Sequence, residues 1–152
     1  MIRIIFVGKL KDEWLREALD EYVKRIGAFT RIETIEVKDE SIIGKDYEKI
    51  KKEEGKRIIN LLDNDYAIAL DINGKAFESV EFAHALKKAS DSNKRLTFIV
   101  GGALGLSDEV LKRCHLRLSL SRMTFTNQMV RLLLIEQIYR AFMILAGKEY
   151  HK

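Results

Sequence analysis

The sequence predicts an α/β domain with a mainly parallel sheet. Short apolar segments, typical of buried strands, alternate along the chain with longer segments whose apolar residues recur at helical spacing. Such alternation is typical of β-α units, in which each helix returns the chain to the start of a neighbouring parallel strand. The chain has 152 residues, of which 47% are hydrophobic, so residues 1–152 can form one domain with a full core.

The first two strands and the helix between them follow from three segments. Segment 3–7 is an apolar run that ends at Gly8. Segment 14–26 has apolar residues at helical spacing, and it is followed by Gly27, a residue type that commonly ends helices. Segment 31–37 alternates polar and apolar residues, as a half-buried strand does.

The middle of the chain predicts a charge-rich helix and a buried strand. The helix is expected over 46–62, and the preceding segment 39–45 is expected to be the most mobile part of the chain. The strand is expected over 66–71. It is followed by Asn73 and Gly74, a pair of residues that commonly forms a turn, so we expect the strand to end there.

The rest of the chain continues the alternation. The expected elements are helix 79–90, strand 95–100, helix 107–114, strand 115–120 and helix 127–146. In open parallel sheets, ligands bind outside the carboxyl ends of the strands. The loops that follow Leu70, Val100 and Leu120 are therefore where the chemistry is expected.

The loop after Val100 contains Gly101, Gly102 and Gly105, which would let the backbone approach a ligand closely. It lacks the lysine and hydroxyl residue of a phosphate-binding P-loop and the spacing of a dinucleotide fingerprint. Asp108 and Glu109 also place negative charge in the next helical turn. A cofactor without phosphates, one that carries positive charge, fits better; the alternative is a tight turn without any ligand.

The last expected helix, 127–146, is apolar over far more than the single stripe that packing on one core requires. Arg131, Glu136 and Arg140 interrupt the apolar residues, which argues against a membrane span. The surplus apolar surface predicts a subunit interface, and a homodimer is the simplest symmetric assembly. The tail leaves directly from the end of this helix, so Tyr150 and His151 are expected to complete the partner's site.

Positive charge gathers near the end of the sequence. Segment 110–152 has eight Lys and Arg residues against Glu136 and Glu149, a net charge of +6, whereas the rest of the chain sums to −2. A basic segment with aromatic residues is typical of a nucleic-acid site. The alternatives are a solvated helical face and a frayed tail after Gly147.

The cysteine and histidine residues predict no metal and no disulfide. Cys114 is the single cysteine, and His84, His115 and His151 lack metal-ligand spacing among themselves or with it. No cleavable apolar leader is recognisable at the start of the sequence. The expected location is the reducing cytoplasm.

Six stretches of the sequence together resemble the RlmH family, the pseudouridine N3-methyltransferases of large-subunit (23S) ribosomal RNA in the SPOUT class. They are VGKLK at 7–11, LDINGK at 70–75, VGGALGL at 100–106, LSLSRMTF at 118–125, VRLLLIEQIYRA at 130–141 and YHK at 150–152. The resemblance runs from the first strand to the last residue, and the ordered set is specific although each piece alone is weak.

The resemblance implies an S-adenosylmethionine-dependent enzyme with a C-terminal trefoil knot, which works as a homodimer on the assembled ribosome. It also implies which residues form the cofactor pocket: Leu70, Gly101, Leu120, Ser121, Arg122, Met123, Thr124 and Phe125. The family usually has Pro-His after the Met-Thr-Phe piece, whereas this chain has Thr126 and Asn127. Asparagine cannot take a proton at neutral pH, so no catalytic base is expected at that position.

Three residues are candidates for catalysis. His151 would transfer a proton or orient the uracil ring, because an imidazole exchanges protons near neutral pH. Tyr150 would stack on the base or hydrogen-bond to it. Arg140 would stabilise negative charge on the base, or would only pair with Glu136 one helical turn away. The expected phosphate contacts are Arg113, Arg117, Arg122 and Lys152.

Two other function classes are compatible with parts of the sequence. A flavodoxin-like small-molecule enzyme shares the order of strands and helices, but it needs a phosphate-binding loop. A non-catalytic ribosome-binding protein explains the basic segment but gives the glycine loop no role.

Overall fold

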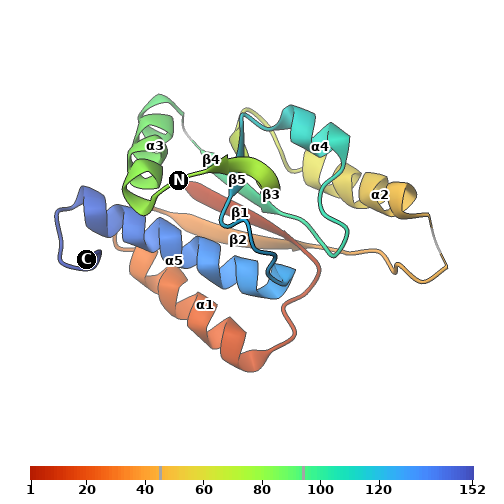
Figure 1. Ribbon diagram of the computed structural model, residues 1–152, viewed down its shortest axis with the longest axis horizontal. Coiled ribbons are helices and arrows are strands. Elements are labelled where there is room, and N and C mark those ends of the chain that lie inside the picture. Colours follow the sequence, from red (N-terminus) through yellow and green to blue (C-terminus); the bar gives the residue numbers. More distant parts are fainter. Residues whose placement is uncertain (45, 94) are drawn as a thin grey trace.

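The computed structural model describes residues 1–152 except Lys45 and Lys94. In this described part, five strands form one parallel sheet in the order β2-β1-β4-β3-β5 (Figure 1). The strands are β1 (Ile2–Val7), β2 (Ile32–Val37), β3 (Tyr66–Ala76), β4 (Leu96–Val100) and β5 (Leu116–Ser119). The expected α/β class with a parallel sheet is confirmed.

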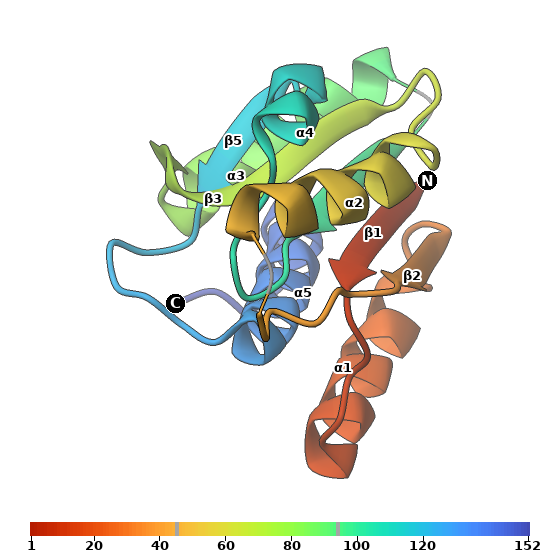
Figure 2. The ribbon, with the colours of Figure 1, turned by 90° about the vertical axis from the view of Figure 1, so that its right-hand side faces the viewer.

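Helices cover both faces of the sheet, as a parallel sheet requires. They are α1 (Glu13–Ile26), α2 (Tyr47–Ile59), α3 (Ser79–Ser92), α4 (Asp108–Arg113) and α5 (Asn127–Leu145). α1, α3 and α5 pack on one face, while α2 and α4 lie together on the other (Figure 2). The expected segment of high mobility ends at Lys45, which lies outside the described residues.

Strand β1 shows how the sequence divides the core between the two faces. Side chains alternate across a strand, so Ile4 and Phe6 join the core under α1, α3 and α5, whereas Ile5 and Val7 join the core under α2 and α4. The run of apolar residues in β1 is therefore explained by burial on both sides.

The expectation that Asn73 and Gly74 end the third strand is wrong. β3 continues to Ala76, and its pairing with β5 shifts register between Leu70 and Lys75. A Cβ atom on Gly74 would lie 2.6 Å from the carbonyl carbon of Arg117, so the glycine permits close approach of the two strands. Asn73 and Gly74 therefore form an irregularity inside a strand rather than a turn. The local sequence does not show this, because the strand continues only where β5 pairs with it.

Helix α5 begins and ends where the sequence predicts. The Thr126 hydroxyl accepts a hydrogen bond from the Met129 backbone amide at 3.2 Å, which caps the helix start. Beyond the helix end, Gly147 has a φ of 65°, which a glycine adopts without strain. No helix in the described residues is both long and apolar enough to cross a bilayer.

Candidate functional site

A cavity of about 400 Å³ lies where strands β3, β4 and β5 end. Its walls come from the carboxyl end of β3, from the glycine loop (residues 101–105) and from the loop that joins β5 to α5. The site thus lies at the edge of the sheet where parallel strands bind ligands. Its volume is in the range of small-molecule and cofactor pockets.

The structure brings most of the expected cofactor residues together around this cavity. Those that line it are Leu70, Gly101, Leu120, Ser121, Met123, Thr124 and Phe125. Arg122 belongs to the same loop but does not line the cavity, and its side chain is exposed. The cavity also has lining residues that the sequence did not single out as ligands, among them Asp71, Asn127 and Val130.

The glycine loop is a tight turn with its backbone exposed to the cavity. The Gly105 amide donates to the Gly102 carbonyl at 3.1 Å, and Gly105 has a φ of 80°. A Cβ atom on Gly101 would lie 2.9 Å from the Gly105 carbonyl carbon, so only glycine fits there. Both readings of this loop, a tight turn and a ligand cradle, are compatible with this geometry.

The residues of the cavity suit S-adenosylmethionine better than a phosphate-bearing cofactor. The glycine loop offers close backbone approach, and apolar side chains with a few hydroxyl groups form the walls. The next helix, α4, carries Asp108 and Glu109 in its first turn. A backbone hydrogen bond lowers the pKa of Glu109, which keeps it ionised near the helix start.

The loop between β5 and α5 is ordered by its own hydroxyl groups. Ser121 Oγ accepts from the Met123 amide at 2.9 Å, and Ser119 Oγ donates to the Ser121 carbonyl at 3.0 Å. Met123 is 74% exposed, and Phe125 is exposed on the same loop. The outer wall of the cavity therefore presents apolar side chains to solvent.

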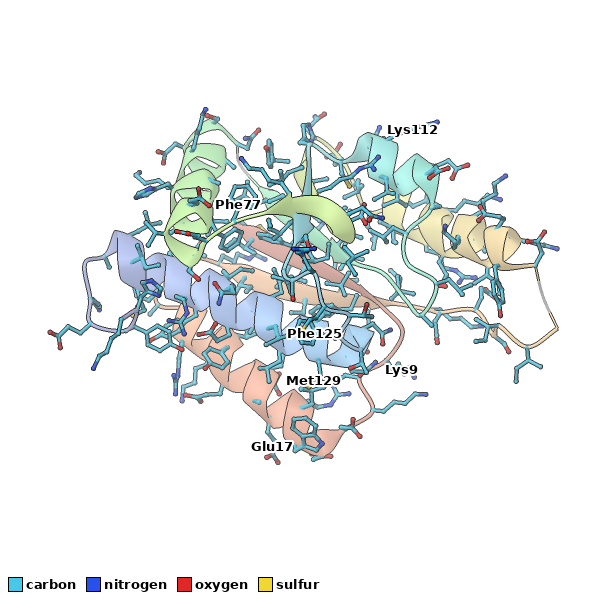
Figure 3. All side chains as sticks on the ribbon, viewed as in Figure 1. Lys9, Glu17, Phe77, Lys112, Phe125 and Met129 are labelled. Carbon is cyan, nitrogen blue, oxygen red and sulfur yellow. The ribbon has the colours of Figure 1, made fainter. Side chains whose placement is uncertain are left out.

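A second cavity of about 230 Å³ adjoins the first and shares Phe125 and Leu120 with it. It extends to Phe77, before α3, and to Leu133 and Gln137 on α5. Figure 3 shows Phe125 in front of the first turns of α5, and Phe77 beside the start of α3. The Gln137 side chain accepts a hydrogen bond from Ser79 Oγ at 2.8 Å, which ties these two helices together.

The C-terminal tail is docked on its own chain, contrary to the frayed-tail alternative. The Tyr150 hydroxyl donates to Glu136 Oε1 at 3.0 Å, and its ring packs edge-on against Tyr139 with 4.9 Å between the ring centres. Arg140 pairs with Glu136, and its Nη1 also contacts His151 Nδ1 at 3.2 Å. Arg140 thus pairs with Glu136 on its own helix and also contacts His151 of the tail.

The tail and the cavity lie at opposite ends of α5. The cavity is lined by Asn127 and Val130 in the first turn, whereas the tail follows the last turn. A helix of 19 residues is about 28 Å long. Figure 1 shows the C-terminus at the end of α5 away from the loop that precedes the helix. Within one chain, the three catalytic candidates are therefore not brought together with the cofactor residues.

The expected phosphate-binding residues fall into two places. Arg113, Arg117 and Arg122 are exposed and lie before, in and after the edge strand β5. Arg117 is 3.9 Å from the Asp71 carboxylate, which lies at the cavity. Lys152 is exposed at the far end of α5, with the tail.

Two charged residues next to lining residues of the cavity are buried, which was not predicted from the sequence. Arg131 is 1% exposed and donates hydrogen bonds to the backbone carbonyl groups of Val7 and Gly8. Glu54 of α2 is buried against Gly102. A charged residue inside an apolar helix was the signal for Arg131, whereas nothing in the local sequence marks Glu54.

The described residues hold no group of three or more His, Cys, Asp or Glu side chains that could bind a metal ion. Cys114 is half-buried, and burial raises the pKa of its thiol to about 11. At neutral pH it stays a protonated, unreactive thiol.

Comparison with known proteins relates the whole chain to methyltransferases. Residues 1–151 match the family described as "Predicted SPOUT methyltransferase". Proteins named ribosomal RNA large subunit methyltransferase H are 48% identical in Clostridioides difficile and 46% identical in Carboxydothermus hydrogenoformans. Each alignment covers 99% of this chain and 99% of the relative.

A solved structure of "a probable methylase family protein from Haemophilus influenzae Rd KW20" has the same fold, with a TM-score of 0.50 at 16% identity. The match covers 96% of this chain and 66% of that chain, so this protein spans about two thirds of its length. That likeness supports the fold, and the family follows from the match over residues 1–151. The chain belongs to the SPOUT methyltransferase family.

Proposed function

We propose that this protein transfers a methyl group from S-adenosylmethionine to N3 of a pseudouridine in large-subunit ribosomal RNA, and that it acts on the assembled ribosome. The observation that carries the proposal is the cavity at the carboxyl ends of β3, β4 and β5, because seven of the eight residues that the family resemblance implies line it. The names of the relatives support a ribosomal RNA substrate. Acting on ribosomes implies a cytoplasmic location.

The proposed reaction is a direct in-line transfer. The chemistry that the bound cofactor supplies is a methyl group activated by an adjacent sulfonium. Gly101 and the loop from Leu120 to Phe125 would hold that cofactor against the sheet edge. These residues would contribute by positioning the cofactor. Because the entropy of bringing the reactants together is then lost on binding, before the reaction begins, positioning can lower the activation barrier by several kcal/mol.

The substrate must lose its N3 proton to become nucleophilic. In the proposal, His151 takes or relays this proton, and Arg140 stabilises the negative charge that develops on the base. Tyr150 positions the base by stacking. Arg113, Arg117, Arg122 and Lys152 contact phosphate groups, which orients the RNA without reading its sequence.

The separation of tail and cavity within one chain supports a homodimer with composite sites. The tail would act on the cavity of the partner subunit, and α5 would form part of the interface. On α5, Leu132 and Leu133 remain only partly buried, and Leu133 lines the second cavity together with the exposed Phe125. An apolar surface of this kind is typical of subunit interfaces.

The C-terminal trefoil knot is part of the same proposal, with residues 1–152 working as one domain. Its support is local: β3, the glycine loop and the loop after β5 all contact one cavity.

Calorimetry with S-adenosylmethionine and with FMN tests the cofactor. The proposal expects binding of S-adenosylmethionine alone. Binding of FMN alone would favour a flavodoxin-like enzyme, and binding of neither would favour a non-catalytic ribosome-binding protein. Methylation assays on whole ribosomes and on an isolated RNA stem-loop then test the substrate, since the basic residues provide salt-sensitive affinity with little sequence reading. Comparable rates on both substrates would contradict the assembled-ribosome part.

A further inference from the structure

Glu54 places a buried carboxyl group against the wall of the cavity. The residue is 7% exposed, and its Oε2 has no hydrogen-bond partner among the described residues. A Cβ atom on Gly102 would lie 3.2 Å from Oε2 and 3.4 Å from Oε1 of this carboxyl group. Gly102 itself lines the cavity. The carboxyl group is therefore separated from the cavity by one glycine backbone.

The position of this carboxyl group is fixed by helix packing. The next residue, Gly55, contacts α4 so closely that a Cβ atom there would lie 2.5 Å from Ser107 Oγ and 3.3 Å from Val110 Cγ2. Ser107 in turn caps α4, since its side chain accepts from the Val110 amide. Because α2 and α4 are locked together at Gly55, Glu54 is held in one place against the glycine loop.

The surroundings of Glu54 leave its charge unbalanced. Asp39 and Glu40 repel it, and the attractive Arg57 is already bound to the Glu40 carboxylate and to the Lys38 carbonyl. Burial, together with Asp39, raises the pKa of Glu54 to about 7.

Among the residues that the structure describes, Arg57 is the only cation found to act on Glu54. Around Gly102, the β1 residue next to the Glu54 carboxyl group is the apolar Val7, and the α4 residues beside Gly55 are the uncharged Ser107 and Val110. Arg131 of α5 is engaged by Glu36 and by backbone carbonyl groups. On its other side, Glu54 faces the cavity across Gly102.

We propose that Glu54 is the counter-charge for the sulfonium of the methyl donor and that it sets the preference of the site for the charged donor over the neutral product. This inference rests on the proposed function, because it takes S-adenosylmethionine as the ligand of the cavity. The product, S-adenosylhomocysteine, has the same adenosine and amino-acid parts but no positive charge on sulfur. An ionised Glu54 therefore attracts the donor more than the product.

The effect depends on pH in a defined direction. Below about pH 7 the free protein carries Glu54 largely protonated, so donor binding must remove this proton, which reduces the preference for the donor over the product. When the donor binds there, the carboxyl group loses its proton to the buffer. Above about pH 7 the carboxylate is already present, and the donor gains affinity relative to the product.

Calorimetry on the full chain measures both ligands at about pH 6 and about pH 8, in two buffers that differ in ionisation heat. For the natural sequence we expect the ratio of donor affinity to product affinity to rise by roughly fivefold or more between these pH values. We also expect proton release on donor binding at the lower pH. Glu54→Gln should abolish both effects and keep its affinity for the product.

Two further variants separate charge from structure. Glu53→Gln removes the neighbouring carboxylate, which pairs with Lys56, and should leave the pH dependence intact. Asp39→Asn removes the repelling charge on an exposed side chain, so it should lower the pKa of Glu54 and move the rise in the affinity ratio to lower pH. This variant tests the inference even if Glu54→Gln does not fold.

Each outcome has one reading. If the natural sequence does not bind the donor, the proposed function fails. If it binds the donor but Glu54→Gln keeps the same pH-dependent ratio, this inference is overturned. If the affinities for donor and product rise equally with pH, the Glu54 carboxylate pairs with the ammonium group that both ligands share. The sulfonium assignment is then overturned.

Discussion

Tyr150 and Glu136 are joined by a hydrogen bond of 3.0 Å between the tyrosine hydroxyl and Oε1 of the carboxylate. The same carboxylate pairs with Arg140, which in turn contacts His151. Glu136 is therefore the anchor that holds the tail on the last turns of α5. Any tail that serves a second subunit must do so from this end of the helix, and the partner's cavity has to lie nearby.

Mixing two inactive variants tests whether the tail serves the partner subunit. One variant lacks residues 148–152, and the other carries Gly101→Arg in the cavity. If tails act across the interface, a heterodimer has one site with both lesions and one site with neither, so methylation should return to about half of the natural level or less. The measurement is ribosome methylation after the variants are co-refolded.

The control for mixing is proof that heterodimers form, for example with a tag on one chain. If heterodimers form and the mixture stays inactive, each tail serves its own subunit and the composite site is refuted.

Gly101→Arg alone should abolish binding of S-adenosylmethionine and leave a folded protein. A Cβ atom at this position already meets the backbone of Gly105 at 2.9 Å, and a long side chain would fill the cavity. Calorimetry measures the loss. The matched control is Gly27→Arg, which lies at the exposed end of α1 with a φ of −55° and should bind normally. Unchanged affinity in Gly101→Arg would refute the cavity assignment.

Arg131→Met should destabilise the fold by about 3 kcal/mol. The substitution removes the donor to the carbonyl groups of Val7 and Gly8 and leaves these acceptors buried without a partner. Urea denaturation gives the free energy of unfolding. Arg113→Met changes an exposed arginine in the same way and should cost less than about 0.5 kcal/mol. If both substitutions lowered the free energy of unfolding equally, the buried contacts of Arg131 would not be what stabilises the fold.

Gly74→Ala should destabilise the protein by about 1–3 kcal/mol and loosen the edge strand β5. The added Cβ would lie 2.6 Å from the Arg117 backbone, which cannot move without breaking the pairing of β3 with β5. Hydrogen exchange of the β5 amides would report the loosening. Asn73→Ala, at an exposed neighbouring position, serves as the comparison and should have little effect.

Tyr150 should ionise at a higher pH than an ordinary tyrosine. Burial and hydrogen bonds to Tyr22 and Glu136 raise the pKa of its hydroxyl in the folded protein. Since the unfolded chain would lose this proton near pH 10, the contribution of Tyr150 to stability is present below that pH and falls as the pH rises above it. An ultraviolet titration of Tyr150→Phe should lack this late step, whereas Tyr47→Phe, at an exposed position, should keep it.

Most of the fold could be predicted because its cues are local. The apolar run of β1, the helical spacing in α1 and the capping residues Thr126 and Gly147 each act within a few residues. Such cues are reliable when neighbouring elements agree with them.

The failures arose where distant partners decide the structure. Asn73 and Gly74 have the local chemistry of a turn, but pairing with β5 keeps them inside a strand. The burial of Glu54 depends on the approach of α2 to α4 at Gly55, which no local pattern encodes. Tertiary contacts override local preference in both cases.

The location of the site could be predicted, but its individual residues could not. The strand ends that the sequence predicts, at Leu70, Val100 and Leu120, lie at one sheet edge, where parallel sheets bind ligands whatever the side chains are. The expectation of which residues bind the cofactor came from the family resemblance. Of the two alternatives for Arg140, the pairing with Glu136 is observed, together with a contact to His151, while stabilisation of charge on the base stays a prediction.

The first helix of the chain packs against the last. Leu15 and Leu19 of α1 share a core with Leu134 and Ile135 of α5, and the two helices lie side by side in Figure 1. All of residues 27–126 are synthesised between them. Until α5 is made, the part of the apolar face of α1 that packs on α5 therefore stays exposed, although β1 already covers its other side. The face of the sheet under α1 and α5 can close only after synthesis is almost complete.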